Sequence, residues 1–343
     1  MSNRTEISTL GEFGLIRHLT DRIEIKNNST IKGVGDDAAI LSYGDKQVLV
    51  TTDLLLEGIH FDLTYVPLKH LGYKSAVVNF SDIYAMNGQP KQITVSLGIS
   101  KRFSVEDVED FYAGLKLACD VYGVDIVGGD TSASLTGLCI SITCIGEGEK
   151  DKVVLRSGAK ETDLICVSGD LGAAYMGLQL LEREKRIFKG EKDFTPDFTG
   201  KEYLLERQLK PEARKDIVEM LRNAGVVPTA MMDISDGLSS ELLHISKESN
   251  VGCRVYEDRI PIDYQTAAMA EQFNMNLVTA ALNGGEDYEL LFTVPLTNHE
   301  KVSEIKGIKI IGHITKPDLG NYLVGRDGGE VELKAQGWNS LDE

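Results

Sequence analysis

Six short segments place carboxylates beside glycine or another small residue, directly against apolar runs. They are GVGDDAAIL, LVTTDLLLEG, VVNFSDIYAM, IVGGDTSAS, MMDISDGLSS and NGGEDYELLF. Taken singly, each is typical of a turn or a helix N-cap, which aspartate favours. Taken together, they require a fold that neutralises carboxylates at the edges of its apolar cores.

Counter-charges are missing near these segments. No Lys or Arg occurs in 75–90, 117–149, 223–246 or 271–300. Asp82 is the sharpest case, because it shares one face of an expected helix with Ser75 and Val78, where capping is unavailable. Half-buried carboxylates without a cation are costly, so the pattern predicts an imported one. Oxygen ligands without Cys or His pairs favour several Mg²⁺ ions over Zn²⁺, together with a phosphate-rich ligand.

Length and composition narrow the class of protein. The 343 residues suggest about two domains. The 36 Lys and Arg against 53 Asp and Glu give a net charge of −17, which disfavours nucleic-acid and membrane-surface partners. The start lacks the apolar stretch of a signal peptide, and five cysteines without CxxC spacing indicate buried thiols. We therefore expect a cytoplasmic protein.

The order of the expected elements favours an α+β fold in two parts. Residues 1–150 read as a first unit that ends in the polar stretch 147–152, and residues 151–343 read as a second. Helices are expected at 9–20, 71–87, 105–122, 173–186, 203–209, 212–224 and 238–248, and strands around a turn at Gly44 and at 92–100, 124–130, 138–148, 163–168, 231–233, 290–296 and 308–315. The charged segment Lys189–Lys201 reads as a surface loop of unassigned role.

Common nucleotide-binding signatures are absent from the sequence. There is no G-x-x-x-x-G-K-[ST] loop, and neither H-R-D nor D-F-G occurs as a kinase signature. Residues 33–38 fit a dinucleotide-binding pattern, but their flanks are a poor strand and a poor helix. The turn Gly169–Gly172 could seat an anion at a helix N-terminus, although a plain turn is favoured.

Seven segments, in order along nearly the whole chain, resemble the thiamine-monophosphate kinase family, whose superfamily includes aminoimidazole ribonucleotide synthetase. They are GVGDDAAI, TTDLLLEGIHF, LGYKSAVVNFSDIYAMNGQP, GVDIVGGDTS, VLRSGAKETDLICVSGDLG, MDISDGLSSELLHI and GGEDYELLFTV. The resemblance implies an aminoimidazole ribonucleotide synthetase-like fold. Its N-terminal domain would bind Mg·ATP and pair through its sheet in a homodimer, and its C-terminal α/β sandwich domain would complete the active site. It further implies that ATP phosphorylates thiamine monophosphate to thiamine diphosphate.

The resemblance also implies site residues by motif position. Mg²⁺ ligands are implied at Asp36, Thr51, Thr52, Asp53, Asp82, Asp130, Asp233 and Asp236. ATP contacts are implied at Tyr112, Gly129, Asp130, Arg156 and Ser235, and acceptor contacts at His60, Glu286 and Trp338. Several Mg²⁺ ions would assist a direct in-line transfer, with no catalytic side chain of the protein.

Two alternatives remain open. A related ATP-dependent synthetase would use the same Mg·ATP chemistry, but a selenophosphate synthetase would need a reactive residue near the N-terminus, and the first cysteine is Cys119. A non-enzymatic nucleotide- or Ca²⁺-binding module is the second alternative. The sequence has neither an EF-hand loop nor a nonapeptide repeat, which argues against a Ca²⁺ module.

Overall fold

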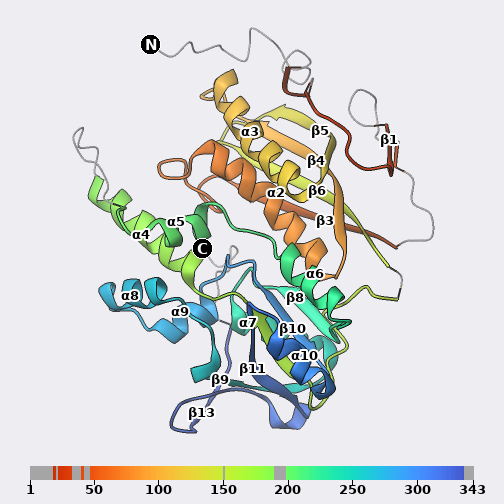
Figure 1. Cartoon of the computed structure of the whole chain (residues 1–343). Helices are drawn as coiled ribbons and strands as arrows, with labels where there is room; N and C mark the ends of the chain where they lie inside the picture. The colour runs from red at the N-terminus through yellow and green to blue at the C-terminus, as the bar shows by residue number, and fades with distance from the viewer. Residues whose placement is uncertain are drawn as a thin grey trace. The chain divides into compact units, whose positions relative to one another are not determined.

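The computed structural model describes residues 18–20, 22–32, 40–41, 47–149, 151–188 and 198–335. The chain divides into two compact units (Figure 1): unit 1 is Met1–Ile83 with Gly88–Asp151, and unit 2 is Tyr84–Asn87 with Lys152–Glu343. The division falls in the polar stretch that ends the first unit in the sequence. Both units mix helices and sheets, which confirms the α+β class. The roles expected of the two parts stay predictions.

Unit 1 is built on a four-stranded sheet in the order β3-β6-β4-β5, in which only β4 and β5 are parallel neighbours. Its strands are β3 (Gln47–Leu56), β4 (Gln89–Ile99), β5 (Asp125–Ala133) and β6 (Cys139–Gly148). Helices α2 (Leu68–Ala85) and α3 (Val105–Tyr122) lie on one face of this sheet (Figure 1). Residues along β6 alternate between buried and half-buried, because only the face toward the helices is covered. The short strands β1 (Thr30–Lys32) and β2 (Ile40–Leu41) pair separately.

The two helices of unit 1 touch backbone to backbone. A Cβ added at Gly72 would lie 1.9 Å from Phe111 O, and one added at Gly114 would lie 1.7 Å from Lys69 O. Only glycine permits this approach, which holds α2 firmly against α3. Ser104 begins α3 with a capping box and the left-handed Gly123 ends it.

Unit 2 is built on a seven-stranded sheet in the order β13-β12-β9-β11-β7-β10-β8. Its strands are β7 (Leu164–Ser168), β8 (Ala230–Asp233), β9 (Gly252–Tyr256), β10 (Leu290–Val294), β11 (Ile308–Thr315), β12 (Asn321–Val324) and β13 (Glu330–Glu332). Apart from the parallel β9 and β12, neighbouring strands are antiparallel. Every residue of the inner strands β7 and β10 is buried, and their sequences are apolar except for Ser168 and Thr293.

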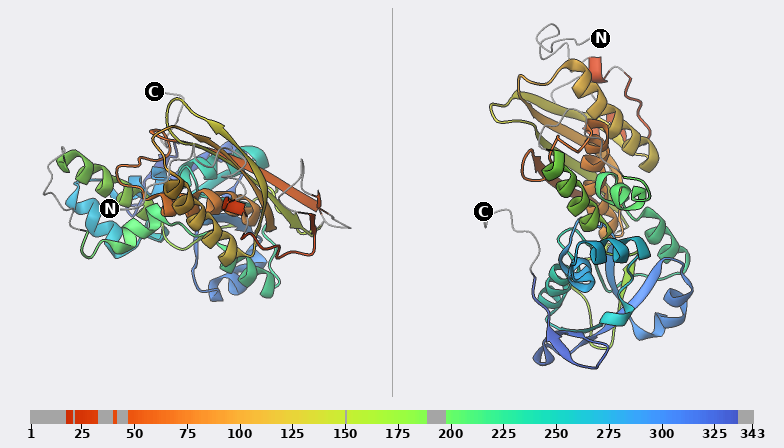
Figure 2. Two further views of the ribbon diagram at one scale, coloured as in Figure 1. Left: turned by 90° about the horizontal axis from the view of Figure 1, so that it is seen from above. Right: turned by 90° about the vertical axis from the view of Figure 1, so that its left-hand side faces the viewer.

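Four helices of unit 2 lie near one another (Figure 2) and contribute residues to one apolar cluster: α4 (Ala173–Phe188), α5 (Glu202–Leu209), α8 (Tyr264–Gln272) and α9 (Leu277–Asn283). A Cβ at Gly177 of α4 would lie 2.2 Å from Leu204 O of α5, so these two helices are also in backbone contact. The remaining helices are α6 (Lys215–Asn223), α7 (Leu238–Ser249) and α10 (His299–Glu304), with 3₁₀ turns at Glu257–Arg259, Leu296–Asn298 and Pro317–Leu319.

Most expected elements that fall within the described ranges are present. The expected helix 9–20 and the turn at Gly44 lie largely outside these ranges, as do residues 189–197 of the expected loop. All five cysteines are free thiols and four are fully buried, which confirms the expectation for them. No helix among the described residues is long and apolar enough to span a membrane.

Candidate active-site residues in the two units

Three predicted ligands meet on the helix-covered face of the unit 1 sheet. Thr51 and Asp53 alternate along β3 and share one face, and Asp82 projects from the interior of α2. Thr51 Oγ1 donates a 2.5 Å hydrogen bond to Asp82 Oδ2. Thr51 and Asp82, which are 31 residues apart in the sequence, thus contact each other where β3 meets α2.

The Asp53 carboxylate is in an environment that disfavours its negative charge. Its Oδ2 atom is buried and has no hydrogen-bond partner among the described residues. Burial, and secondarily the charge of Asp82, raise the pKa of Asp53 to about 7. A cation beside Asp53 and Asp82 would offset both the burial of Asp53 and the repulsion between the two carboxylates. The oxygen donors of this Asp53–Asp82 pair therefore fit the Mg²⁺ expected here.

Other predicted ligands of unit 1 lie apart from the Asp53–Asp82 pair. Thr52 points to the opposite face of β3, where its Oγ1 donates to Ile142 O at 3.1 Å. Asp130 is exposed on β5, while Asp53 lies on β3. These are the two edge strands, three inter-strand spacings or roughly 14 Å apart, so one ion cannot contact both carboxylates. Asp36 lies outside the described residues.

No set of three or more His, Cys, Asp and Glu side chains in the described ranges is arranged to hold a metal ion. A cation held by these parts of the chain would therefore also need hydroxyl, backbone, water or substrate oxygens. Mg²⁺ commonly binds in this way, through one or two carboxylates.

Three other predicted residues of unit 1 have defined local roles. The backbone N–H of Leu56 donates to His60 Nδ1 at 3.0 Å, so a neutral His60 carries its proton on Nε2 and can donate it to an anion. A Cβ at Gly129 would lie 1.8 Å from Val95 O, so this position admits only glycine. Burial raises the pKa of Tyr112 to about 12, and the phenol therefore stays protonated at neutral pH.

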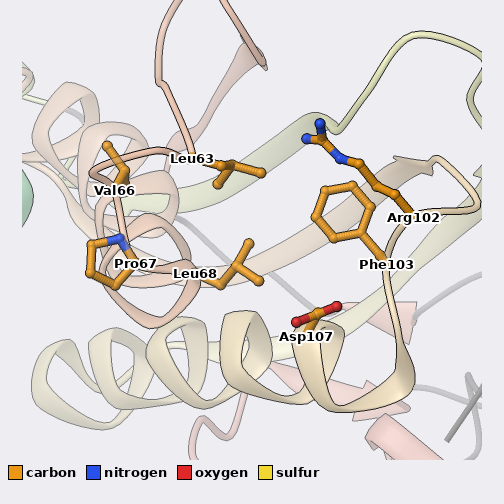
Figure 3. A pocket seen from close by; sticks show the side chains of 7 residues that line it. All are labelled: Leu63, Val66, Pro67, Leu68, Arg102, Phe103 and Asp107. Atoms are coloured by element: carbon orange, nitrogen blue, oxygen red, sulfur yellow. The ribbon is translucent and has the colours of Figure 1, made fainter. Parts of the chain in front are cut away.

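A cavity of about 470 Å³ also lies in unit 1, and Figure 3 shows its lining of Leu63, Val66, Pro67, Leu68, Arg102, Phe103 and Asp107. Its polar groups already have partners within the protein. Arg102 pairs with Glu57 and lies over the Phe103 ring, and the Asp107 carboxylate accepts from the backbone N–H of Ser104 at 2.7 Å. None of the predicted site residues lines this cavity.

In unit 2, the predicted residue Asp233 ends β8, and the predicted residues Ser235 and Asp236 lie in the turn between β8 and α7. The backbone N–H groups of Ser235 and Asp236 donate to Glu241 Oε1 at 3.1 and 2.8 Å. Glu241 is buried, and burial raises its pKa to about 8, with the charges of Asp236 and Asp233 acting in the same direction. Glu241 was not among the predicted residues. A glutamate in the first turn of a helix that follows S-D-G is its sequence signal.

A second loop, 285–288, lies against this turn. The N–H of Glu286 donates to Ser235 O at 2.7 Å, and that of Tyr288 donates to Ile234 O at 2.9 Å. Gly285, Glu286 and Tyr288 have φ values of 70°, 58° and 51°. Such left-handed backbone is costly for non-glycine residues, and the surrounding contacts must maintain it.

Asp287 is directed from this loop to the start of α4. Its carboxylate accepts from Gly172 N at 2.8 Å and from Ala174 N at 3.4 Å. The protein's own carboxylate thus occupies the helix N-terminus at which the sequence allowed an external anion, and the plain turn is confirmed. Burial raises the pKa of Asp287 to about 6.

The expectation that every acidic segment lacks a counter-charge is wrong for this loop. Arg207 Nη2 lies 3.5 Å from Asp287 Oδ1, and Arg207 Nη1 lies 2.7 Å from Glu289 Oε1. Arg214 also pairs with Glu289. Both arginines precede the loop by more than 70 residues, so the neighbouring sequence could not reveal them.

The last predicted residues are Arg156 and Trp338. Arg156 is exposed in unit 2, on a segment that runs beside β8, because Met231 N donates to Leu155 O at 3.0 Å. Trp338 lies outside the described residues. The predicted ATP and acceptor contacts that are described therefore come from both units.

Comparisons with known proteins agree with the motifs. The family described as AIR synthase related protein, N-terminal domain, matches residues 35–147. The thiamine-monophosphate kinase of Aquifex aeolicus is 36% identical over 320 residues, which are 91% of this chain and 97% of that protein. The one from Bacillus subtilis is 32% identical over 338 residues, 96% of this chain and 99% of that protein.

Solved structures show the same relationship. The structure described as "AaThiL complexed with AMPPCP and TMP" has a TM-score of 0.74 at 35% identity, covering 98% of this chain and 99% of that one. Hydrogenase maturation protein HypE in complex with ATP has a TM-score of 0.73 at 18% identity, covering 94% and 92%, and shows the shared fold alone. With identities above 30% over nearly the full length of its relatives, this chain belongs to the thiamine-monophosphate kinase family.

Proposed function

We propose that this protein transfers the γ-phosphoryl group of ATP to thiamine monophosphate, forming thiamine diphosphate and ADP. The observation that carries the proposal is the 35% identity, over 98% of this chain, to a protein whose structure is described as complexed with AMPPCP and TMP. The Asp53–Asp82 pair supports it, since it lies in this chain at the motif positions expected to serve a metal-bound phosphate.

Thr51, Asp53 and Asp82 would hold Mg²⁺ in unit 1, together with Asp36, and Thr52 would serve from the opposite face of β3. Asp130 would serve a separate ion, and Asp233 and Asp236 would supply ligands from unit 2. When bound, Mg²⁺ would neutralise phosphate charge and reduce the repulsion between two polyanions. The unpartnered Asp53 Oδ2 is the feature of this chain that best fits such an ion.

The transfer itself requires no protein nucleophile. A phosphate oxygen of thiamine monophosphate would form a bond to the γ-phosphorus, and the bond from that phosphorus to the β–γ bridging oxygen would break, leaving ADP. The second pKa of a phosphate monoester is about 6, so the acceptor is mostly dianionic at neutral pH and needs no general base. The chain's part is to orient the two substrates in line and to exclude water.

The proposed substrate contacts divide between the two ligands. Tyr112, Gly129, Asp130, Arg156 and Ser235 would contact ATP, and Trp338, His60 and Glu286 would contact thiamine monophosphate. The Nε2–H of neutral His60 is suited to a phosphate oxygen. The Glu286 carboxylate is suited to the positively charged thiazolium ring.

The active form is proposed to be a homodimer that pairs through the unit 1 sheets. Val48, Val50 and Leu54 of β3 are 44%, 64% and 52% exposed. They alternate along the strand and lie on the sheet face opposite α2 and α3. An apolar stripe on an edge strand is suited to burial against a second copy.

Product analysis tests the proposed function. The purified protein is incubated with Mg·ATP and thiamine monophosphate, and the products are separated and quantified. Equimolar thiamine diphosphate and ADP are expected. Formation of product only from formylglycinamidine ribonucleotide would instead identify a related synthetase.

A further inference from the structure

Helix α5 presents three polar side chains, those of Tyr203, Arg207 and Gln208, to two loops of unit 2. One loop carries Asp170 and the other carries Glu286. Tyr203 Oη lies 2.7 Å from both carboxylate oxygens of Asp170, and Arg207 Nη2 donates to Asp170 O at 3.0 Å. Gln208 Nε2 donates to Glu286 Oε2 at 2.8 Å. Tyr203 and Arg207, four residues apart, lie on the helix face that contacts Asp170. Gln208, the next residue along, extends the contact of α5 to Glu286.

The position of α5 is itself closely determined. Its backbone meets α4 at Gly177, and Leu204 is fully buried in the cluster beneath. Gln208 is 5% exposed, so its side chain has little space in which to change rotamer. A donor held in this way fixes the position of the carboxylate that it contacts.

The backbone of Glu286 is fixed independently of Gln208. Its N–H is bonded to Ser235 O, and the next residue, Asp287, is bonded to the start of α4. Arg207 Nη2 also contacts Asp287 O at 3.4 Å. With the backbone held by these contacts, the hydrogen bond from Gln208 acts on the side chain of Glu286.

We propose that Gln208 is a positioning residue for acceptor specificity, which orients the Glu286 carboxylate toward the cationic ring of thiamine monophosphate. This inference rests on the proposed function. Gln208 acts through Glu286 and does not itself touch the substrate. Loss of the donor would therefore weaken acceptor binding while the site for ATP is unchanged.

A double-mutant cycle tests the inference. Gln208→Met keeps the length of an unbranched side chain without the donor, and Gln208→Glu keeps the shape but places a second carboxyl group beside Glu286. Both are made in the wild-type and the Glu286→Gln background, with exposed Glu206→Gln on the same helix as the matched control. The kcat and the KM values for thiamine monophosphate and ATP are measured, and circular dichroism confirms folding.

Gln208→Met is expected to raise the KM for thiamine monophosphate about fivefold to tenfold, with kcat and the KM for ATP within about twofold. Gln208→Glu is expected to raise it further, and Glu206→Gln to leave all three constants unchanged. In the Glu286→Gln background, Gln208→Met should have almost no further effect, because the negative charge that Gln208 orients toward the cationic ring is already absent. A merely structural role would lower stability equally in both backgrounds.

Equal effects of Gln208→Met in the two backgrounds, or equal changes in the KM values for both substrates, would overturn the inference while leaving the proposed function intact. A folded Gln208→Met variant with wild-type constants would do the same. A wild-type protein that neither converts nor binds thiamine monophosphate would overturn the proposed function, and this inference with it.

Discussion

Arg207 Nη1 lies 2.7 Å from Glu289 Oε1, and the two side chains join α5 to the start of β10 across 82 residues of sequence. Glu289 is 1% exposed and also accepts from Arg214 and from Ser168 Oγ. Its negative charge therefore balances two half-buried cations, and the same network holds the loop that carries Glu286 and Asp287. The structural consequences of removing this charge can be measured directly.

Replacing Glu289 with Gln should destabilise unit 2. The change leaves Arg207 and Arg214 close together without their shared partner, and breaking a buried ion pair from one side costs roughly 3–5 kcal/mol. Urea unfolding followed by circular dichroism measures the change. Glu206→Gln, exposed on α5, should stay within about 0.5 kcal/mol of the wild type. A loss below about 1 kcal/mol for Glu289→Gln would show that the network is dispensable.

Asp53→Asn should stabilise the metal-free protein in a pH-dependent manner. The folded-state pKa of Asp53 is about 7, against an ordinary value of 3.8, so ionisation lowers stability as the pH rises from about 4 to 7. Removing the charge should therefore raise stability by roughly 1–3 kcal/mol at pH 8 and much less at pH 5. Thermal melts in EDTA at both pH values measure it.

Asp130→Asn is the matched control for these melts, because Asp130 is exposed on the other edge strand and should show no such gain. With saturating Mg²⁺, Asp53→Asn, Asp82→Asn and Asp130→Asn should each nearly abolish turnover. An Asp53→Asn variant that unfolds without metal where the wild type does not would instead mark Asp53 as a structural residue.

Mg·ATP should raise the melting temperature far more than ATP in EDTA. A ligand that binds only the native state stabilises it by RT ln(1 + [L]/Kd), and the acidic pair should repel ATP without its cation. Differential scanning fluorimetry at matched ATP concentrations measures both shifts, with Mg²⁺ alone as the control. Equal shifts in the two conditions would exclude a metal-phosphate site at these carboxylates.

Gly114→Ala should destabilise unit 1 by at least about 1–3 kcal/mol, because its Cβ would overlap Lys69 O at 1.7 Å and force α2 away from α3. Chemical denaturation of the variant checks this. Gly98→Ala is a suitable control, since its Cβ would meet only side-chain atoms, the nearest being Cys139 Cβ at 3.3 Å, and should cost less. Similar stabilities of the two variants would contradict the close helix contact.

Unphosphorylated thiamine should be a poor acceptor. Its hydroxyl has a high pKa and would need a positioned base, which the proposed site does not include, whereas the phosphate of thiamine monophosphate is already ionised. Parallel assays with the two acceptors at equal concentration measure the ratio of rates. Comparable rates would contradict transfer to a phosphate oxygen.

The sequence by itself was sufficient for features that depend on neighbouring residues. The helix 105–122 follows from apolar periodicity between Ser104 and Gly123, and its limits agree with α3. The family follows from short motifs in a fixed order, because residue type and spacing survive without any three-dimensional information. The free, mostly buried cysteines follow from their apolar surroundings.

Only the tertiary structure decided which charges meet. The same rule of missing local cations applied to Asp82 and to Asp287. Asp287 is paired with Arg207 from a distant helix, whereas Asp82 adds its charge to the effect of burial, which raises the pKa of a second carboxylate, Asp53. Strand order, likewise, separates Asp130 from Asp53 by the width of a sheet. Electrostatic energy depends on distance in space and on burial, and neither can be obtained from separation along the chain.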